Sequence, residues 1–240
     1  MSTCIEVRNL TKSFKGRTVV KNLSFEVKRQ EVFGLLGHNG AGKSTTIETL
    51  LGLKKADSGN LAIFGKEPRK HRKEIFEKIG VQLQASNYQN NIRVDEICQE
   101  MSVLYKDPAD YRELLKKFKL ENLEKAQVNK LSGGERQKLS VVLALIPKPE
   151  IIFLDELTTG LDTAARREVW KQLKQLKQEG TTIVLTTHYM EEAESLCDRI
   201  CLIKDGKKVV EGTVEEVVSK SPYDNLEEAY LWHMGEEITL

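Results

Sequence analysis

The segment from residue 37 to residue 44 reads Gly-His-Asn-Gly-Ala-Gly-Lys-Ser, which places closely spaced glycines before a lysine and a hydroxyl side chain. This is the pattern of a phosphate-binding loop. Glycines let the backbone curl until several N–H groups face one anion, and a helix beginning at Lys43 adds partial positive charge. We expect Lys43 to reach the β- and γ-phosphates of a nucleotide and the Ser44 hydroxyl to coordinate Mg²⁺. The alternative, a turn with a chance lysine, would not require the apolar strand before the loop and the helix after it.

Two adjacent carboxylates, Asp155 and Glu156, end an apolar run at residues 151–154. In a parallel sheet the carboxyl ends of the strands face the ligand crevice. Asp155 is then placed to bind Mg²⁺ directly or through water, and Glu156 to polarise an attacking water. Taken alone, an acidic pair after a strand is as well explained as the start of a loop. The phosphate-binding loop in the same chain favours the functional interpretation.

A second candidate anion site lies at residues 131–135, which read Leu-Ser-Gly-Gly-Glu. Ser132 and Glu135 have the spacing of a capping box, so the segment also fits an ordinary helix start. Gly133 and Gly134 are not needed for capping. They expose backbone N–H groups at a helix N-terminus, where an anion can bind.

The elements that must position these residues follow from hydrophobic periodicity. Residues 5–10, 19–27, 31–37 and 61–64 are predicted strands, and a helix is predicted from Lys43 to about Leu51. Helical spacing dominates 94–105, 108–118 and 135–146. Strands are then expected at 151–154, 182–186 and 200–203, and helices at 163–178 and 190–196. This order predicts an α/β fold with a mostly parallel sheet, an N-terminal antiparallel β portion and a helical insert at about 85–148.

Composition restricts the class of protein. The chain of 240 residues is 40% hydrophobic, and 37 basic against 36 acidic residues give a net charge of +1. A nucleic-acid partner is therefore not expected, because such proteins carry a clear basic excess. We see no apolar run near the ~20 residues of a membrane-spanning helix and no secretory signal, so we expect a soluble intracellular chain. The four scattered cysteines predict reduced thiols.

Taken together, residues 37–44, 131–135 and 151–156 resemble, in order and separation, the Walker A, LSGGE and Walker B motifs of ABC (ATP-binding cassette) transporter subunits. The resemblance runs from about residue 5 to residue 212. It implies a P-loop NTPase core within an ABC ATPase domain at 1–212. Residues 213–240 are expected to form an acidic helical tail, because they are rich in acidic residues and Thr213 and Glu216 have the spacing of a capping box. The cofactors that the resemblance implies are ATP and Mg²⁺.

Further roles are carried over by resemblance, one position at a time. Gln84 matches the Q-loop residue that contacts Mg²⁺ or the attacking water, and Gln82 fits that spacing less well. His188 matches the switch histidine at the γ-phosphate, and Asp162 matches the D-loop, although it also fits a helix N-cap. Phe14 matches the aromatic residue that stacks on adenine, although it also fits a core position. The implied ATP-binding set is Phe14, Gly37, His38, Asn39, Gly40, Ala41, Gly42, Lys43, Ser44 and Thr45, with Leu131, Ser132, Gly133, Gly134 and Glu135 acting on the nucleotide of a second subunit.

The resemblance also implies partners: a second ATPase subunit, identical or homologous, and transmembrane permease subunits on separate chains. The chain would then be cytoplasmic and peripheral on the inner face of the membrane. Residues 79–84 and 187–194 look like the ABC-2 type exporter branch, whereas importers more often carry aspartate where this chain has Tyr189. An importer ATPase, a translation or DNA-repair ATPase and a small-molecule kinase are the alternatives. Leu157 replaces the family's common proline and predicts a less stiff loop after Glu156.

Overall fold

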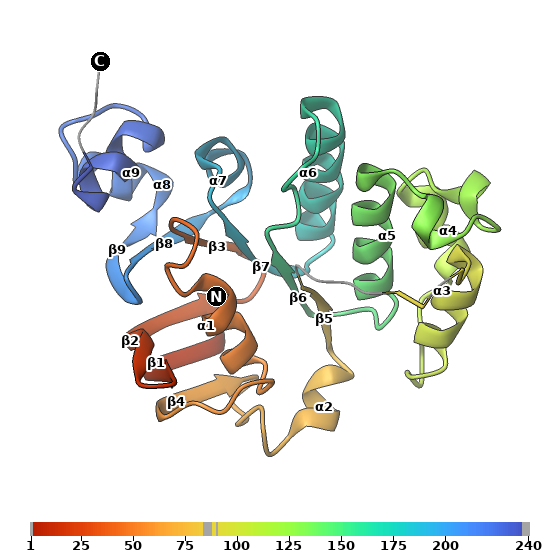
Figure 1. Cartoon of the computed structure of the whole chain (residues 1–240), viewed down its shortest axis with the longest axis horizontal. Coiled ribbons are helices and arrows are strands. Elements are labelled where there is room, and N and C mark those ends of the chain that lie inside the picture. Colours follow the sequence, from red (N-terminus) through yellow and green to blue (C-terminus); the bar gives the residue numbers. More distant parts are fainter. Residues whose placement is uncertain (1, 84–87, 90, 237–240) are drawn as a thin grey trace. The chain divides into compact units, whose positions relative to one another are not determined.

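The computed structural model describes residues 2–83, 88–89 and 91–236, and the chain forms two compact units. Unit 1 is Met1–Ile75 with Thr182–Leu240, and unit 2 is Phe76–Thr181. Figure 1 shows their helices and strands. In the described part of the chain, no helix combines the length and the apolar character needed to cross a membrane.

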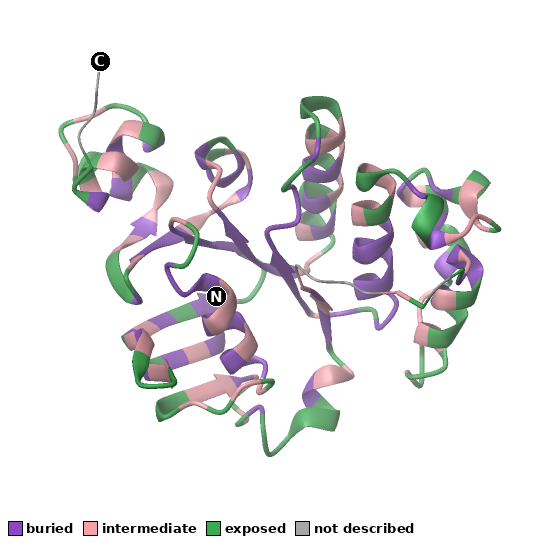
Figure 2. Ribbon diagram, viewed as in Figure 1, coloured by how far each residue is buried: buried purple, intermediate pink, exposed green. Residues whose placement is uncertain are grey.

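An antiparallel sheet in unit 1 has the strand order β2-β1-β4. The strands are β1 (Thr3–Phe14), β2 (Arg17–Lys28) and β4 (Ser58–Ile63). Lys15 and Gly16 connect β1 to β2 with φ values of 47° and 82°, as a tight hairpin turn requires. Buried residues are interspersed with more exposed residues along these strands (Figure 2). The predicted N-terminal antiparallel portion is confirmed.

A second group of strands in unit 1 has the order β7-β3-β8-β9. The central strand β3 (Val32–Leu36) runs parallel to β7 (Thr182–Thr187) and β8 (Arg199–Lys204), while β9 (Lys207–Thr213) is antiparallel to β8. All residues of β3 and β7 are buried (Figure 2), as expected for parallel strands covered on both faces. Helix α1 (Lys43–Leu50) follows β3 after the glycine-rich segment. The mostly parallel sheet is thus confirmed, and β9 is an addition that alternation did not predict.

The C-terminal helices of unit 1 pack on the elements before them. Helices α7 (Met190–Leu196), α8 (Val214–Ser219) and α9 (Leu226–Met234) contribute to one hydrophobic cluster with β8. Met190, Val217 and Met234 are buried in it. The N–H of Leu226 donates to Glu194 Oε1 at 3.0 Å and ties α9 to α7. The acidic residues of α8 and α9 are exposed or half-buried, whereas Glu192 on α7 is buried.

Unit 2 contains the parallel pair β5 (Ile79–Gln82) and β6 (Ile151–Asp155) and the helices α3 (Val94–Ser102), α4 (Tyr111–Lys117), α5 (Gly133–Leu145) and α6 (Thr163–Gln178). The short helix α2 (Arg72–Phe76) precedes β5, and two 3₁₀ segments, Glu121–Leu123 and Val128–Lys130, lead to α5. Strand β5 lies so close to α5 that a Cβ added at Gly80 would be 2.0 Å from the Ala144 carbonyl oxygen. Glycine is therefore required at this position.

Cys4, Cys98, Cys197 and Cys201 form no disulfide bond in the described part of the chain. Burial raises the pKa of Cys4 to about 11 and the pKa values of Cys98 and Cys201 to about 12. These three thiols stay protonated near neutral pH and are therefore poor nucleophiles, while the expectation of reduced thiols stays a prediction.

Candidate functional site

The glycine-rich segment curls between β3 and α1 through left-handed backbone conformations. Gly40 has φ 83°, and Gly42, the residue that caps α1, has φ 105°. Glycine adopts such angles without the strain that a Cβ would add. At Gly37 the constraint is space, because an added Cβ would lie 2.4 Å from the Ile203 carbonyl oxygen. The loop needs glycines at these points for its own geometry, independently of any ligand.

Neighbouring segments hold this loop in place. The N–H of Gly206, in the turn between β8 and β9, donates to the Ala41 carbonyl at 3.0 Å. The Gly206 carbonyl in turn accepts from the N–H of Lys21 on β2 at 2.8 Å. On the same side, a Cβ at Gly42 would lie 2.9 Å from the Val19 carbonyl oxygen. The shape of the loop is therefore fixed by the protein itself.

Lys43 supplies the positive charge of the loop. Its side chain is buried, and its Nζ donates to the carbonyl oxygens of Gly37 at 2.8 Å and His38 at 3.3 Å. The ammonium group thus lies against the curled backbone, at the first residue of α1, where the helix end is also positive. This combination suits a multiply charged phosphate chain.

His188 lies at the same edge of the parallel sheet as the loop. Leu36, the last residue of β3, pairs with Thr187, the last residue of β7. The chain therefore enters the loop at Gly37 and reaches His188 from neighbouring strands, which are about 4.8 Å apart. The Tyr189 N–H donates to Thr187 Oγ1 at 3.0 Å, and the ring centroids of His188 and Tyr189 are 4.2 Å apart. Unit 1 thus brings the predicted switch histidine beside the predicted phosphate loop.

Phe14 ends β1, and the residue is 38% exposed rather than part of the core. The ammonium groups of Lys12 and Lys54 lie 5.0 and 5.1 Å from the ring centroid, within the range of a cation–π contact. Lys12 also pairs with Asp57 at 3.1 Å, and this hydrogen bond lowers the pKa of the Asp57 carboxyl. Phe14 therefore offers an accessible aromatic surface, as a base-stacking role requires.

Replacing Phe14 with alanine is expected to weaken ATP binding by ~1–3 kcal/mol, the magnitude measured for base–aromatic stacking in nucleic-acid sites. Tyrosine or tryptophan at this position keeps a flat aromatic face and should retain most of the affinity. Titration calorimetry on the three variants measures the difference. An equal loss in all three would show that Phe14 acts through packing and not through stacking.

In unit 2, β6 delivers the two carboxylates. Asp155 and Glu156 are both buried, and Glu156 has φ 50°. A left-handed conformation costs a non-glycine residue about 1–3 kcal/mol and is kept where the surrounding structure enforces it. Here the Thr159 N–H donates to the Glu156 carbonyl at 3.2 Å and closes the turn. Leu157, in place of the family's common proline, is buried within it.

The segment around Ser132 caps helix α5. Ser132 Oγ accepts from the Glu135 N–H at 3.3 Å, and Glu135 Oε2 accepts from the Ser132 N–H at 2.8 Å. This hydrogen bond from the Ser132 backbone lowers the pKa of Glu135. The capping box that the sequence pattern indicates is therefore present. Ser132 and Gly133 are nevertheless exposed, whereas the second half of α5 is buried (Figure 2), so the N-terminal end of the helix is accessible.

The predicted D-loop lies beside this helix start. An added Cβ at Gly134 would contact side chains of Leu161 and Ala165 at 3.7 Å. Asp162 Oδ1 accepts from the Ala165 N–H at 2.8 Å and caps α6, as its alternative interpretation expects. Asp162 itself is exposed. Unit 2 thus brings the LSGGE segment and the D-loop together on its surface.

The predicted site residues are therefore divided between the two units. Phe14, residues 37–45 and His188 belong to unit 1, and residues 131–135, Asp155, Glu156 and Asp162 belong to unit 2. Gln84 lies outside the described residues. In the described chain, no group of three or more His, Cys, Asp or Glu side chains could hold a metal ion by itself. That pattern is not needed for Mg²⁺ bound to a nucleotide, which commonly uses one or two carboxylates together with phosphate oxygens.

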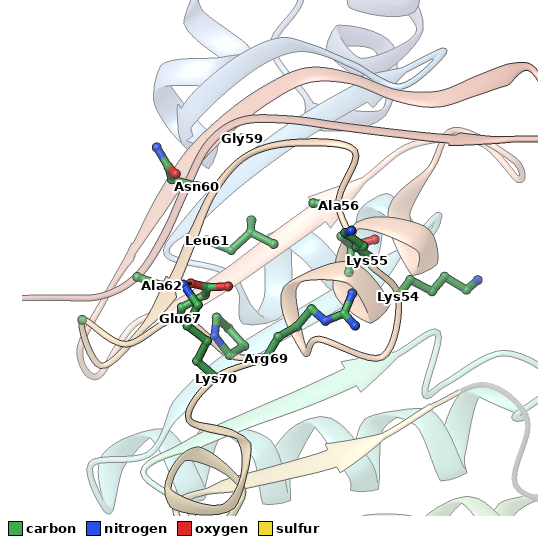
Figure 3. Close-up of a pocket in the computed structure, with 13 residues that line it drawn as sticks. Lys54, Lys55, Ala56, Gly59, Asn60, Leu61, Ala62, Glu67, Arg69 and Lys70 are labelled. Carbon is green, nitrogen blue, oxygen red and sulfur yellow. Dashed lines mark ion pairs between the residues drawn. The ribbon is translucent and has the colours of Figure 1, made fainter.

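Figure 3 shows a cavity of about 640 Å³ in unit 1, whose lining residues include none of residues 37–45. It is beside the C-terminal end of α1, about 10 Å along the helix from Lys43 at 1.5 Å per residue. Lys54, Lys55 and Arg69 line it, and a Cβ at Gly52 would lie 3.1 Å from Arg69 Cγ. Lys54 also forms an ion pair with Glu48 on α1, which gives it a structural role.

Sequence comparison finds that residues 20–159 match the family model described as ABC transporter. A Nod factor export ATP-binding protein I of Burkholderia orbicola (strain AU 1054) is 40% identical over 219 residues, covering 89% of this chain and 72% of the relative. The protein of the same name from Cupriavidus metallidurans (strain ATCC 43123 / DSM 2839 / NBRC 102507 / CH34) is 39% identical over 235 residues, covering 96% and 78%.

Solved structures agree with this result. An ATP-binding subunit of an ABC transporter superposes with a TM-score of 0.87 at 26% identity, covering 96% of this chain and 99% of the other. The dimeric structure of MJ0796, a bacterial ABC transporter cassette, gives a TM-score of 0.79 at 28% identity, covering 87% and 98%. The similarity extends over nearly the whole chain.

Proposed function

This chain belongs to the ABC transporter family as an ATP-binding subunit with ATPase activity, and we propose that it powers export through permease subunits on separate chains. The observation that carries the proposal is the match over 89% of the chain to relatives named as export ATP-binding proteins. Tyr189 after His188 agrees with an exporter, by the resemblance described above. The subunit would act at the inner face of the cell membrane, held there by its permease.

In the proposed mechanism, the N–H groups of the loop and Lys43 hold the triphosphate. Glu156 orients the attacking water and accepts its proton, and His188 contacts the γ-phosphate. Positioning and electrostatic stabilisation are the main contributions of a protein to phosphoryl transfer. The burial of Lys43 and Glu156 supports these roles, because charge interactions are stronger where water is scarce.

The donor set fits Mg²⁺, since a hydroxyl and a carboxylate supply the oxygen ligands that this ion prefers. Ser44, at the start of α1, and Asp155, at the end of β6, would hold it, together with Gln84. When bound, the ion neutralises charge on the phosphates during transfer. Asp155 contributes by presenting its carboxylate from a buried strand end.

The exposed start of α5 supports a two-subunit site. Ser132, Gly133 and Gly134 of one subunit would cover the γ-phosphate held by Lys43 of the other, so that two ATP molecules join the dimer. Hydrolysis would then release it. The dimeric MJ0796 cassette shows that a related protein forms a dimer.

The proposal is tested by isolating the tagged subunit from membranes of the producing cell and identifying the membrane protein bound to it. Both are then reconstituted into proteoliposomes with ATP on the side of the ATPase. We expect ATP-dependent movement of solute away from that side. Movement toward it would identify an importer, and recovery with ribosomes or DNA in place of a membrane protein would support the non-transport alternative.

A further inference from the structure

The side chain of Gln82 bridges the ends of β5 and β6. Gln82 is the last residue of β5 and is buried. Its Oε1 accepts the Asp155 N–H at 3.1 Å, and its Nε2 donates to the Leu83 carbonyl at 3.0 Å. Both functional groups of the amide are thus satisfied within unit 2. By sequence spacing, Gln82 is only a weaker candidate than Gln84 for the Q-loop position.

This hydrogen bond begins where the backbone ladder stops. The last paired residues of the two strands are Gln82 and Leu154, so Asp155 is one residue beyond the end of β5. The Gln82 side chain takes the position that a backbone carbonyl would hold if β5 continued. Buried backbone N–H groups are almost always paired, so the side chain meets a definite need. An apolar residue at position 82 would leave the Asp155 N–H without this partner.

The bridge is anchored on both sides. Strand β5 cannot shift toward α5, because Gly80 is already in close backbone contact with Ala144. Beyond Asp155, the chain enters the left-handed conformation of Glu156 and is fastened by the hydrogen bond from Thr159. The Asp155–Glu156 peptide therefore lies between two fixed points. One fixed point is the Gln82 side chain, and the other is the turn that Thr159 closes.

We infer that Gln82 is a positioning residue for hydrolysis, which sets the orientation of the Asp155 carboxylate and of Glu156 through the backbone N–H of Asp155. This inference rests on the proposed roles of those two carboxylates. Partners in the outer shell of a metal site typically change metal affinity or activity about 10–100-fold when they are mutated. Gln82 occupies that place for Asp155, and it joins the strand end to the segment that leads to Gln84.

The first test measures hydrogen exchange of the Asp155 amide by NMR in the full chain without nucleotide. Gln82→Met keeps the length of the side chain but removes the strong acceptor, and exchange should be about fivefold faster or more, from the typical net strength of one hydrogen bond. Gln82→Glu keeps an accepting oxygen and should retain protection. Ile79→Val, elsewhere on β5, loosens packing without touching Asp155 and should leave exchange at that amide unchanged.

The second test separates positioning from folding. In Gln82→Met, the Mg²⁺ concentration for half-maximal ATPase rate should rise, or kcat should fall, about 10–100-fold. ATP binding measured in EDTA, and KM for ATP, should change little, and Ile79→Val should behave as wild type. Unchanged exchange at Asp155, or faster exchange with unaltered Mg²⁺ dependence and kcat, would overturn the inference. A wild-type chain without Mg²⁺-dependent hydrolysis would instead refute the proposed function, and the exchange measurement would still report on the bond.

Discussion

Replacing Glu156 with glutamine is expected to reduce ATP turnover by about 10²–10⁴-fold, the usual contribution of a general base, while ATP binding is retained. Glutamine keeps the shape and hydrogen-bonding reach of the side chain but cannot accept the proton of the attacking water. The left-handed backbone at Glu156 belongs to the turn, so an amide in place of the acid adds no backbone strain. Single-turnover hydrolysis and nucleotide-binding assays measure the two quantities. Glu100→Gln, an exposed exchange of the same chemistry on α3, is the matched control.

The same variant tests the two-subunit site. ATP that is bound but not hydrolysed should hold two chains together, and gel filtration should show a dimer only when ATP is present. Adding Ser132→Arg introduces bulk and charge at the exposed start of α5 and should abolish this dimer while each monomer still binds ATP. A Glu156→Gln protein that stays monomeric with saturating ATP, both alone and with its permease, would falsify the sandwich mechanism.

Replacing Lys43 with alanine is expected to weaken ATP binding by about 2–5 kcal/mol, the cost of truncating one partner of a buried charge pair. The reason is that Lys43 places a buried ammonium group against the curled loop. Equilibrium binding of a fluorescent ATP analogue gives the affinity. Lys55→Ala removes an exposed lysine of the same unit and should leave it unchanged.

Asp155→Asn provides a contrast to Lys43→Ala. It should preserve metal-free nucleotide binding and remove the stimulation of binding and hydrolysis by Mg²⁺. Wild-type behaviour in either variant would show that the site residues are wrongly assigned.

Elements with strong local signals were predicted well. Helix α6 begins at Thr163 and ends at Gln178, as its periodicity predicts, because an N-cap aspartate and a regular apolar face define it. Strand β6 is recognisable in the sequence by the continuous apolar run at residues 151–154, which is typical of a strand whose residues are all buried. Each of the three chemical motifs is one unbroken segment of the sequence, so each can be identified without knowledge of the fold.

Other features depend on tertiary structure and could not be predicted in this way. Apolar spacing predicts a helix to residue 105, but helix α3 ends at Ser102. Val103 and Leu104 are exposed, so no apolar packing stabilises a longer helix there. Strand β9 carries charged residues typical of an edge strand, and β5 is only four residues long and contains Gly80. The contact of Gln82 with Asp155 spans 73 positions and depends on the register of β5 with β6.

The bracing of the phosphate loop has a thermodynamic consequence. Ordering a flexible backbone costs about 1–2 kcal/mol per residue in conformational entropy, and a ligand that orders its own loop loses that amount from its affinity. Here the turn at Gly206 and the backbone of Val19 already fix the loop. Little of the interaction energy with the triphosphate is then consumed in shaping its binding site. Calorimetry should accordingly find no large unfavourable entropy from loop ordering when the nucleotide binds, and association should not be limited by a slow folding step of the loop.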